Sequence, residues 1–292
     1  MEFLQGIYQL EIVGKVTVAE FVGLKLTAGR LPTDGIMPLS HTLDTPGPLA
    51  RSVEDTIMMF QVMDGVEGWQ MDRDRAAGTG VYSSLTATAT GLRLGVLDDK
   101  ERAQCTGEVL DAYDAALDVL RSLGAVLEVF HSPKAYDVLT ETSGHLIAAE
   151  GFHHHGHLYD DPAQPMDEDV RARMLAGKDV SAKEYLAIRE DRQQTTADYL
   201  AAMQGFDAVI TPTMTTAAPP VADVDQAISP AHFTRHVNLL GMCALAVPTG
   251  LTSGGLPTSL QIIARANEED MTLRIGSSLE AAQSPIGHPA IG

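Results

Sequence analysis

The chain has 292 residues and a formal net charge of -19, with an isoelectric point near 4.7. Nucleic acid and anionic membrane surfaces would repel such a chain, so we expect neither as a partner. No stretch approaches the roughly 18 apolar residues of a membrane span, and Glu2 and Glu11 stand where a signal peptide would be basic and apolar. We therefore expect a cytoplasmic protein. Its two cysteines, Cys105 and Cys243, are too few for a disulfide framework.

The segment from Gly23 to Asp55 is the richest in turn-forming residues, with glycine or proline wherever the backbone needs a fixed or a positive φ. Ser52-Val-Glu-Asp55 then opens an apolar-periodic stretch that ends at Gly65, which predicts a capped helix with a glycine stop. From Gly65 to Thr90 the composition is polar and rich in Gly, Asp and Ser, so we expect a surface loop there.

The central part of the chain is expected to alternate strands and helices, in the order strand 92–97, helix 109–120, strand 125–130, helix 136–157 and helix 181–203. The first three elements form a βαβ unit, which implies parallel strands joined by a right-handed crossover. Gly124 ends the first helix. Ser181 and Glu184 form a capping box that opens the last helix.

The final third is expected to hold a buried strand from Asp207 to Thr211, then a β-hairpin, then a helix from Glu268 to Ala282. The hairpin strands are 245–251 and 258–264, with a Ser-Gly-Gly turn between them. This alternation predicts an α/β fold in which helices flank a mixed β-sheet.

The pattern GLK-T-GR, followed by G--PL---LDT-GP-AR--ED, closely resembles the amidase signature family, whose members hydrolyse amide bonds. The stretches FDAVITPTMTTAAPP at 206–220 and FTRHVNLLGMCALAVPTGLTSGGLPTSLQIIARA at 233–266 resemble later elements of that family, in the family's order. The resemblance covers about residues 22–282 and implies an amidase-signature-like α/β domain.

The same resemblance implies that the catalytic serine, the cis-serine and the lysine lie upstream of the GLK segment. Residues 1–21 contain no serine, the first serine is Ser40, and no Gly-Gly-Ser run occurs. We therefore expect a truncated form, incomplete at the N-terminal side, with no assignable catalytic residue; Lys15 and Lys25 receive no catalytic role. The expected division is a non-matching segment 1–21, a partial domain 22–282 and a frayed tail 283–292.

Two functions remain open from the sequence. The chain is either an amidase-family hydrolase of amide C–N bonds whose missing elements come from elsewhere, or a non-catalytic remnant that acts as a binding or self-associating scaffold. An active form would take a small-molecule amide substrate. In both cases a sheet without its flanking elements leaves apolar surface bare, so we expect a homo-oligomer.

Four residues are candidates for substrate contact. By the resemblance, Asp34 and His41 lie in a loop that faces the catalytic pocket, where they would favour a polar or cationic group; alternatively Asp34 supports an Asp-Gly turn and His41 is a surface residue. Thr213 and Met214 follow a strand end that breaks into a proline-bounded loop, a frequent ligand position in α/β folds. A plain connection is the alternative for this pair.

Two other patterns suggest chemistry but favour plainer interpretations. The run from His153 to His157, followed by Asp160 and Asp161, places two imidazoles four residues apart on a helix, as in some metal sites. A solvated surface cluster is the favoured interpretation, so we predict no metal and no cofactor. A serine hydrolase built from Ser40, Ser52, Ser83 or Ser84 with a histidine is not expected, because no G-x-S-x-G elbow is present.

Overall fold

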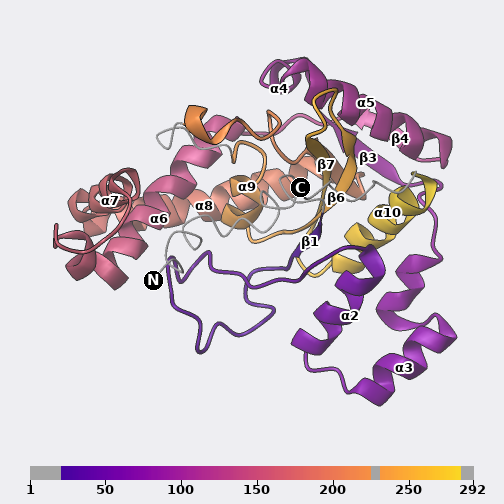
Figure 1. The fold of residues 1–292 in the computed structure, drawn as a ribbon, viewed down its shortest axis with the longest axis horizontal. Helices are drawn as coiled ribbons and strands as arrows, with labels where there is room; N and C mark the ends of the chain where they lie inside the picture. Colours follow the sequence, from indigo (N-terminus) through magenta and orange to yellow (C-terminus); the bar gives the residue numbers. More distant parts are fainter. Residues whose placement is uncertain (1–20, 225–230, 284–292) are drawn as a thin grey trace.

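The computed structural model describes residues 21–224 and 231–283, which build a mixed seven-stranded sheet with helices on both faces (Figure 1). The strand order is β2-β1-β6-β7-β5-β3-β4. The strands are β1 (Val22–Lys25), β2 (Leu49–Ala50), β3 (Arg93–Val96), β4 (Val126–Val129), β5 (Ala208–Pro212), β6 (Cys243–Leu251) and β7 (Pro257–Ala264). The predicted α/β fold with a mixed sheet is confirmed. Expectations for the first 20 residues and for most of the tail lie outside the described residues.

The helices are α2 (Val53–Met63), α3 (Gly68–Ala77), α4 (Asp99–Arg102), α5 (Gly107–Ser122), α6 (Tyr136–Tyr159), α7 (Glu168–Leu175), α8 (Ala182–Ala202), α9 (Arg235–Leu239) and α10 (Glu269–Ala282). Three short 3₁₀ turns join them, η1 (Gly80–Leu85), η2 (Ala176–Asp179) and η3 (Val221–Asp223). Among these described helices, none is both long and apolar enough to cross a membrane.

The strand pairing follows the sequence pattern closely. β3 runs parallel to β4 and to β5, and α5 makes the crossover between β3 and β4, so the predicted βαβ unit is confirmed. β6 and β7 form the predicted hairpin, which closes with a hydrogen bond from the Thr252 N–H to the Leu256 carbonyl of 2.7 Å. β7 also pairs antiparallel with β5, which joins the hairpin to the parallel part of the sheet.

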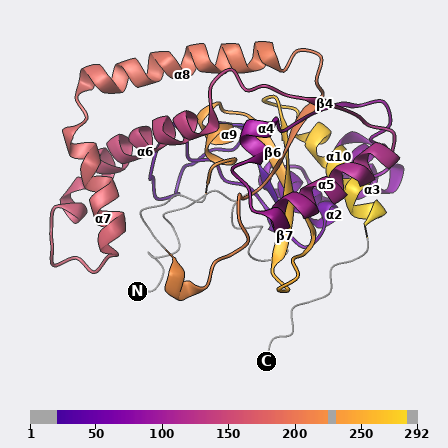
Figure 2. The same ribbon diagram turned by 90° about the horizontal axis from the view of Figure 1, so that it is seen from above.

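The two faces of the sheet carry different helices. α2, α5 and α10 pack on one face, whereas α9 lies on the other with α6 against it, and Figure 2 shows these two sets on opposite sides of β6 and β7. The sheet interior is apolar, because Leu94, Leu245 and Ile262 are fully buried. α6 and α7 extend beyond the sheet and share a small core of their own around Tyr159 and Met174.

Helix caps account for two of the predicted helices. The Ser52 hydroxyl accepts a hydrogen bond from the Asp55 N–H (3.1 Å) and begins α2, and Gly65 follows the end of that helix with a φ of 78°. At α8, the Ser181 hydroxyl accepts from the Glu184 N–H, and the Glu184 carboxylate accepts from the Ser181 N–H at 2.8 Å. Both caps can be predicted from the sequence because each joins a serine side chain to the backbone N–H three residues further on.

The loop predicted from Gly65 to Thr90 is wrong, since this stretch forms α3 and η1. α3 buries none of its residues, so it has no apolar stripe by which a helix is recognised in a sequence. Its contacts are polar and exposed, and they include an ion pair of 2.6 Å from Arg75 to Glu54 on α2 and the stacking of Arg73 on Trp69 within α3. α3 lies at the surface, as expected for this stretch, but Tyr82 of η1 and Ala89 are buried in the main core. α7 is a further helix that the sequence pattern does not predict.

Gly177 in η2 gives a direct test of how closely α6 is packed. A Cβ at this position would lie 1.9 Å from the carbonyl oxygen of Ala148 on α6, and a backbone atom cannot swing aside. We expect Gly177→Ala to lower the free energy of unfolding by about 3 kcal/mol. Urea denaturation measures it.

Gly107→Ala is the matched control, because Gly107 begins α5 and has no atom within 4 Å of an added Cβ. We expect its stability to be unchanged or raised by up to about 1 kcal/mol. Equal stability of the two variants would contradict the close η2–α6 contact.

Candidate functional site

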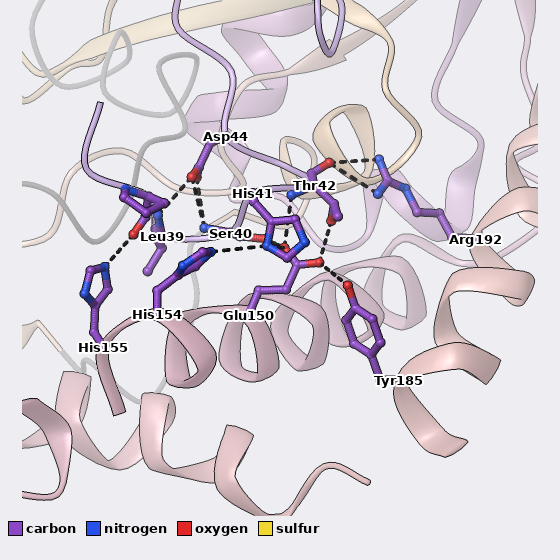
Figure 3. Close-up of polar contacts among 11 residues, drawn as sticks. Leu39, Ser40, His41, Thr42, Asp44, Glu150, His154, His155, Tyr185 and Arg192 are labelled. Carbon is purple, nitrogen blue, oxygen red and sulfur yellow. Dashed lines mark hydrogen bonds and ion pairs between the residues drawn. The ribbon is translucent and has the colours of Figure 1, made fainter. Parts of the chain in front are cut away.

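The carboxylate of Glu150, on α6, is the centre of a polar cluster that holds the loop after β1 (Figure 3). Its side chain is only 1% exposed. It accepts hydrogen bonds from the Ser40 hydroxyl (2.6 Å), the Thr42 N–H (3.1 Å), the Thr42 hydroxyl (2.8 Å) and the Tyr185 hydroxyl (2.8 Å). Burying a carboxylate is unfavourable unless such donors meet its lone pairs. The cluster therefore joins this loop to α6 and α8 at one point.

The same donors determine the charge of the group. Burial raises the pKa of the Glu150 carboxyl, but the hydrogen bonds from Ser40, Thr42 and Tyr185 outweigh burial and bring the pKa below its usual 4.5. Glu150 is therefore ionised at neutral pH, with its negative charge spread over four donors.

A second carboxylate, Asp44, shapes the loop itself. Its oxygens accept from the backbone N–H groups of Leu39 (2.9 Å) and Ser40 (3.1 Å), and the Asp44 N–H donates to the Ser40 carbonyl at 2.7 Å. Burial raises the pKa of Asp44, against the effect of those two N–H donors. The segment from Leu39 to Asp44 is thus a tight turn closed by its own side chain.

Arg192 of α8 fixes the loop from the other side (Figure 3). Its two terminal nitrogens donate to the Thr42 carbonyl, each at 3.3 Å, and its Nε donates to the Leu239 carbonyl at the end of α9. One guanidinium therefore ties together α8, α9 and the loop.

His41 faces α6, and its Nδ1 lies 3.2 Å from Nε2 of His154, so one of the two rings donates to the other. The same Nδ1 is 3.6 Å from the Glu150 carboxylate. Burial lowers the pKa of His154, and the neighbouring His153, His41 and His155 lower it further. His41 is about half exposed, so it combines a surface position with a contact to the buried cluster.

Asp34 lies apart from this cluster, in an exposed turn. The Ile36 N–H donates to the Thr33 carbonyl at 3.0 Å, and Gly35 has a φ of 82°, which that turn requires. Asp34 thus has the Asp-Gly turn position that the sequence indicates. Its contact with substrate stays a prediction.

Thr213 and Met214 lie just after β5, beside β7 and α5. Thr213 is fully buried; its hydroxyl accepts from the Ser259 hydroxyl at 2.7 Å. Met214 is half-buried and borders a small hollow together with Tyr113 and Thr258. The structure therefore gives this pair its own surroundings, separate from those of His41 and Glu150, and its role toward substrate stays a prediction.

A larger hollow of about 220 Å³ lies between α6, α7 and the start of α9. Apolar side chains such as Ile147, Val170 and Met174 form much of its lining. His145, Arg173 and Arg235 also line it, and the described lining residues include no acidic side chain. An apolar hollow with a few convergent polar groups is typical of small-molecule sites.

The other sequence candidates have ordinary structural partners. Ser40 donates to Glu150, Ser52 caps α2, and Ser83 and Ser84 donate to backbone carbonyls. Lys25 is buried and donates to the Met242 carbonyl at 2.6 Å, and burial lowers its pKa to about 7. Among the described residues no group of three or more His, Cys, Asp or Glu side chains is placed to hold a metal ion.

The sequence pattern does not identify Glu150, Tyr185, Arg192 or the two arginines of the larger hollow. One signal for Glu150 is present, since it is the single charge in the run LIAAEGF of a predicted helix. An acid in such a run is rarely buried unless it is paired. Arg192 carries no comparable signal, because its partners Thr42 and Leu239 lie far from it in the sequence.

The sequence and the fold of the chain are similar to those of a known protein family. A family model described as Amidase matches residues 18–273. The chain is 30% identical over 281 residues to 2-amino-5-chloromuconic acid deaminase of Comamonas testosteroni, covering 93% of this chain and 58% of the relative. It is 32% identical over 304 residues to a glutamyl-tRNA(Gln) amidotransferase subunit of Mycolicibacterium gilvum (strain PYR-GCK), covering 91% and 61%.

A solved structure described as an amidase superimposes with a TM-score of 0.79 at 25% identity, over 94% of this chain and 61% of that one. The chain thus spans about three fifths of the length of the proteins that it matches.

Glu150→Gln tests whether the buried carboxylate holds the loop. A carboxamide keeps one acceptor oxygen and turns an NH₂ group toward the donors, so we expect the free energy of unfolding to fall by about 2 kcal/mol. Glu141→Gln, on an exposed position of the same helix, is the control and is expected to change it by less than about 0.5 kcal/mol.

The pH dependence of the difference in unfolding free energy between wild type and Glu150→Gln tests whether the Glu150 carboxyl is ionised. Because the pKa of Glu150 is lower in the folded chain than its usual 4.5, its ionised form stabilises the fold above that pH and loses this effect as the pH falls through the folded value. The gap between wild type and Glu150→Gln should therefore be constant from about pH 5 to 7 and shrink below about 4.5. A gap that widens in acid would show that the carboxyl is neutral in the cluster.

Proposed function

Because the chain belongs to the amidase signature family, we propose that it serves the hydrolysis of an amide C–N bond and contributes the substrate-binding wall of the active site. The hollow between α6, α7 and α9 supports this, because it combines an apolar lining with basic side chains. We assign to it the part of a small amide substrate that is not cleaved.

The substrate class follows from the charges in that hollow, and this observation carries the proposal. Arg173 on α7 and Arg235 on α9 line it, and His145 on α6 lines it as well. A guanidinium offers paired N–H donors that match a carboxylate, so we propose an amide that also bears a carboxylate. One relative, 2-amino-5-chloromuconic acid deaminase, is named after a carboxylic acid.

Bond cleavage needs groups that we do not assign within this sequence. The resemblance to the family implies that amide hydrolysis uses an activated hydroxyl, a base and N–H donors for the oxyanion. Ser40, Ser52, Ser83 and Ser84 have other partners, and no Gly-Gly-Ser run is present. We therefore assign no nucleophile among these four serines, and we propose that the described residues contribute substrate binding to amide hydrolysis.

The remaining assignments are proposals of the same kind. His41 and Asp34 on the loop after β1, and Thr213 and Met214 after β5, are kept as candidate substrate contacts. We also propose that the protein is cytoplasmic. We further propose that it self-associates, since Val126 and Val129 are about half exposed on the edge strand β4. Sedimentation at micromolar concentration tests self-association, and a monomer would refute it.

Incubation of the purified chain with aryl amides and with a fluorophosphonate probe tests the absence of a nucleophile. We expect no turnover above the uncatalysed rate and no stoichiometric labelling of any serine, because hydroxyl activation needs a nearby oriented base. Labelling of one serine, in proportion to a loss of amide hydrolysis, would show that this chain carries a working site of its own.

Calorimetric titration with succinamate, a carboxylate-bearing amide, and with its neutral analogue succinamide tests the substrate class. We expect succinamate to bind at least about tenfold more tightly, since a hydrogen bond to a charged group contributes about 1.5–3 kcal/mol. Arg173→Met should remove most of this preference.

Arg121→Met, which removes a charge from an exposed position on α5, is the control and should retain the preference. Equal binding of both ligands by the unaltered chain would contradict the carboxylate assignment.

A further inference from the structure

Gly144 on α6 and Arg235 at the start of α9 form a contact that bears on the larger hollow. A Cβ added at Gly144 would lie 3.3 Å from Nη1 of Arg235, tighter than ordinary van der Waals contact. Glycine therefore lets the guanidinium lie directly against the helix. Both residues line the hollow, so this contact fixes where a positive charge enters it.

Arg235 and Arg173 lie on different helices. Arg235 begins α9, which packs near β6, whereas Arg173 lies on α7, and Figure 1 shows α6 between these two helices. Both side chains are half-buried, and Met174 and Ile147 share the lining with them. Charges beside apolar surface interact more strongly with a bound ion than charges in open water do.

We propose that Arg235, seated on Gly144, is a specificity-determining residue that selects the carboxylate end of the substrate. The assignment rests on the proposed function and names a second recognition group for it. Gly144 acts as a positioning residue, because its missing side chain sets the location of the guanidinium.

The two residues can be tested by variants with opposite effects on stability. Arg235→Met removes the charge, and Arg235→Lys keeps the charge but loses the paired donors. Gly144→Ala moves the guanidinium by a few tenths of an ångström, yet alanine favours a helix interior more than glycine does. This last variant separates the position of the guanidinium from the stability of the fold.

The experiment is calorimetric titration of succinamate and succinamide into the full chain, with thermal unfolding of each variant. We expect Arg235→Met to weaken succinamate binding about 10- to 100-fold and to leave succinamide binding unchanged. Arg235→Lys should retain part of the preference. Gly144→Ala should weaken succinamate binding several-fold while its Tm is unchanged or rises by up to about 3 °C.

Arg51→Met, at an exposed position before α2, is the control for a lost positive charge and should bind as the unaltered chain does. Succinamate affinity that survives Arg235→Met would overturn the inference, as would unaltered affinity in a well-folded Gly144→Ala. If Arg173→Met removes the preference for succinamate and Arg235→Met does not, the proposed function is supported and the role of Arg235 is refuted. If the unaltered chain does not prefer succinamate to succinamide, the proposed function and the role of Arg235 are both refuted. If Arg235→Met does not fold, Gly144→Ala and Arg235→Lys decide.

Discussion

The buried charge of Glu150 is the constraint on which the arrangement around the candidate site depends. An ionised carboxylate in a protein interior is unfavourable unless donors surround it, and here Ser40, Thr42 and Tyr185 do so. These donors come from the loop after β1 and from α8, so satisfying one charge fixes two elements against α6. Arg192 adds α9 through the Thr42 and Leu239 carbonyls. Polar satisfaction therefore sets the position of this loop.

α6 serves the hollow through a second face, which is made of small residues. Gly144, Ala148 and Gly151 are four and three residues apart and so share one face of the helix. Each has a close neighbour: Arg235 at Gly144, Gly177 at Ala148 and Met174 at Gly151. Larger side chains here would push α9, η2 and α7 outward. One helix thus fixes both the buried carboxylate and the hollow that carries the arginines.

The sequence predicts what depends on nearby residues and misses what depends on distant ones. The caps at Ser52 and Ser181 follow from spacing within a few residues, and the hairpin and the βαβ unit follow from elements that are consecutive in the sequence; all are present. Glu150 and Ser40 are 110 positions apart, so no local pattern relates them. The histidine run illustrates the same limit: His154 has its polar contact with His41, from a distant loop, and the run itself holds no sign of this partner.

The net charge of -19 and a site for an anion are compatible, because the two effects act over different distances. The repulsion from dispersed surface carboxylates is screened beyond about 8 Å at physiological ionic strength. Arg173 and Arg235 would act at contact distance beside apolar surface, where screening by water and salt is weakest. An acidic surface also disfavours binding of the same anion elsewhere on the molecule. A carboxylate held by two guanidiniums would then leave the amide group of the substrate with a restricted position, and such restriction is how binding energy lowers a reaction barrier.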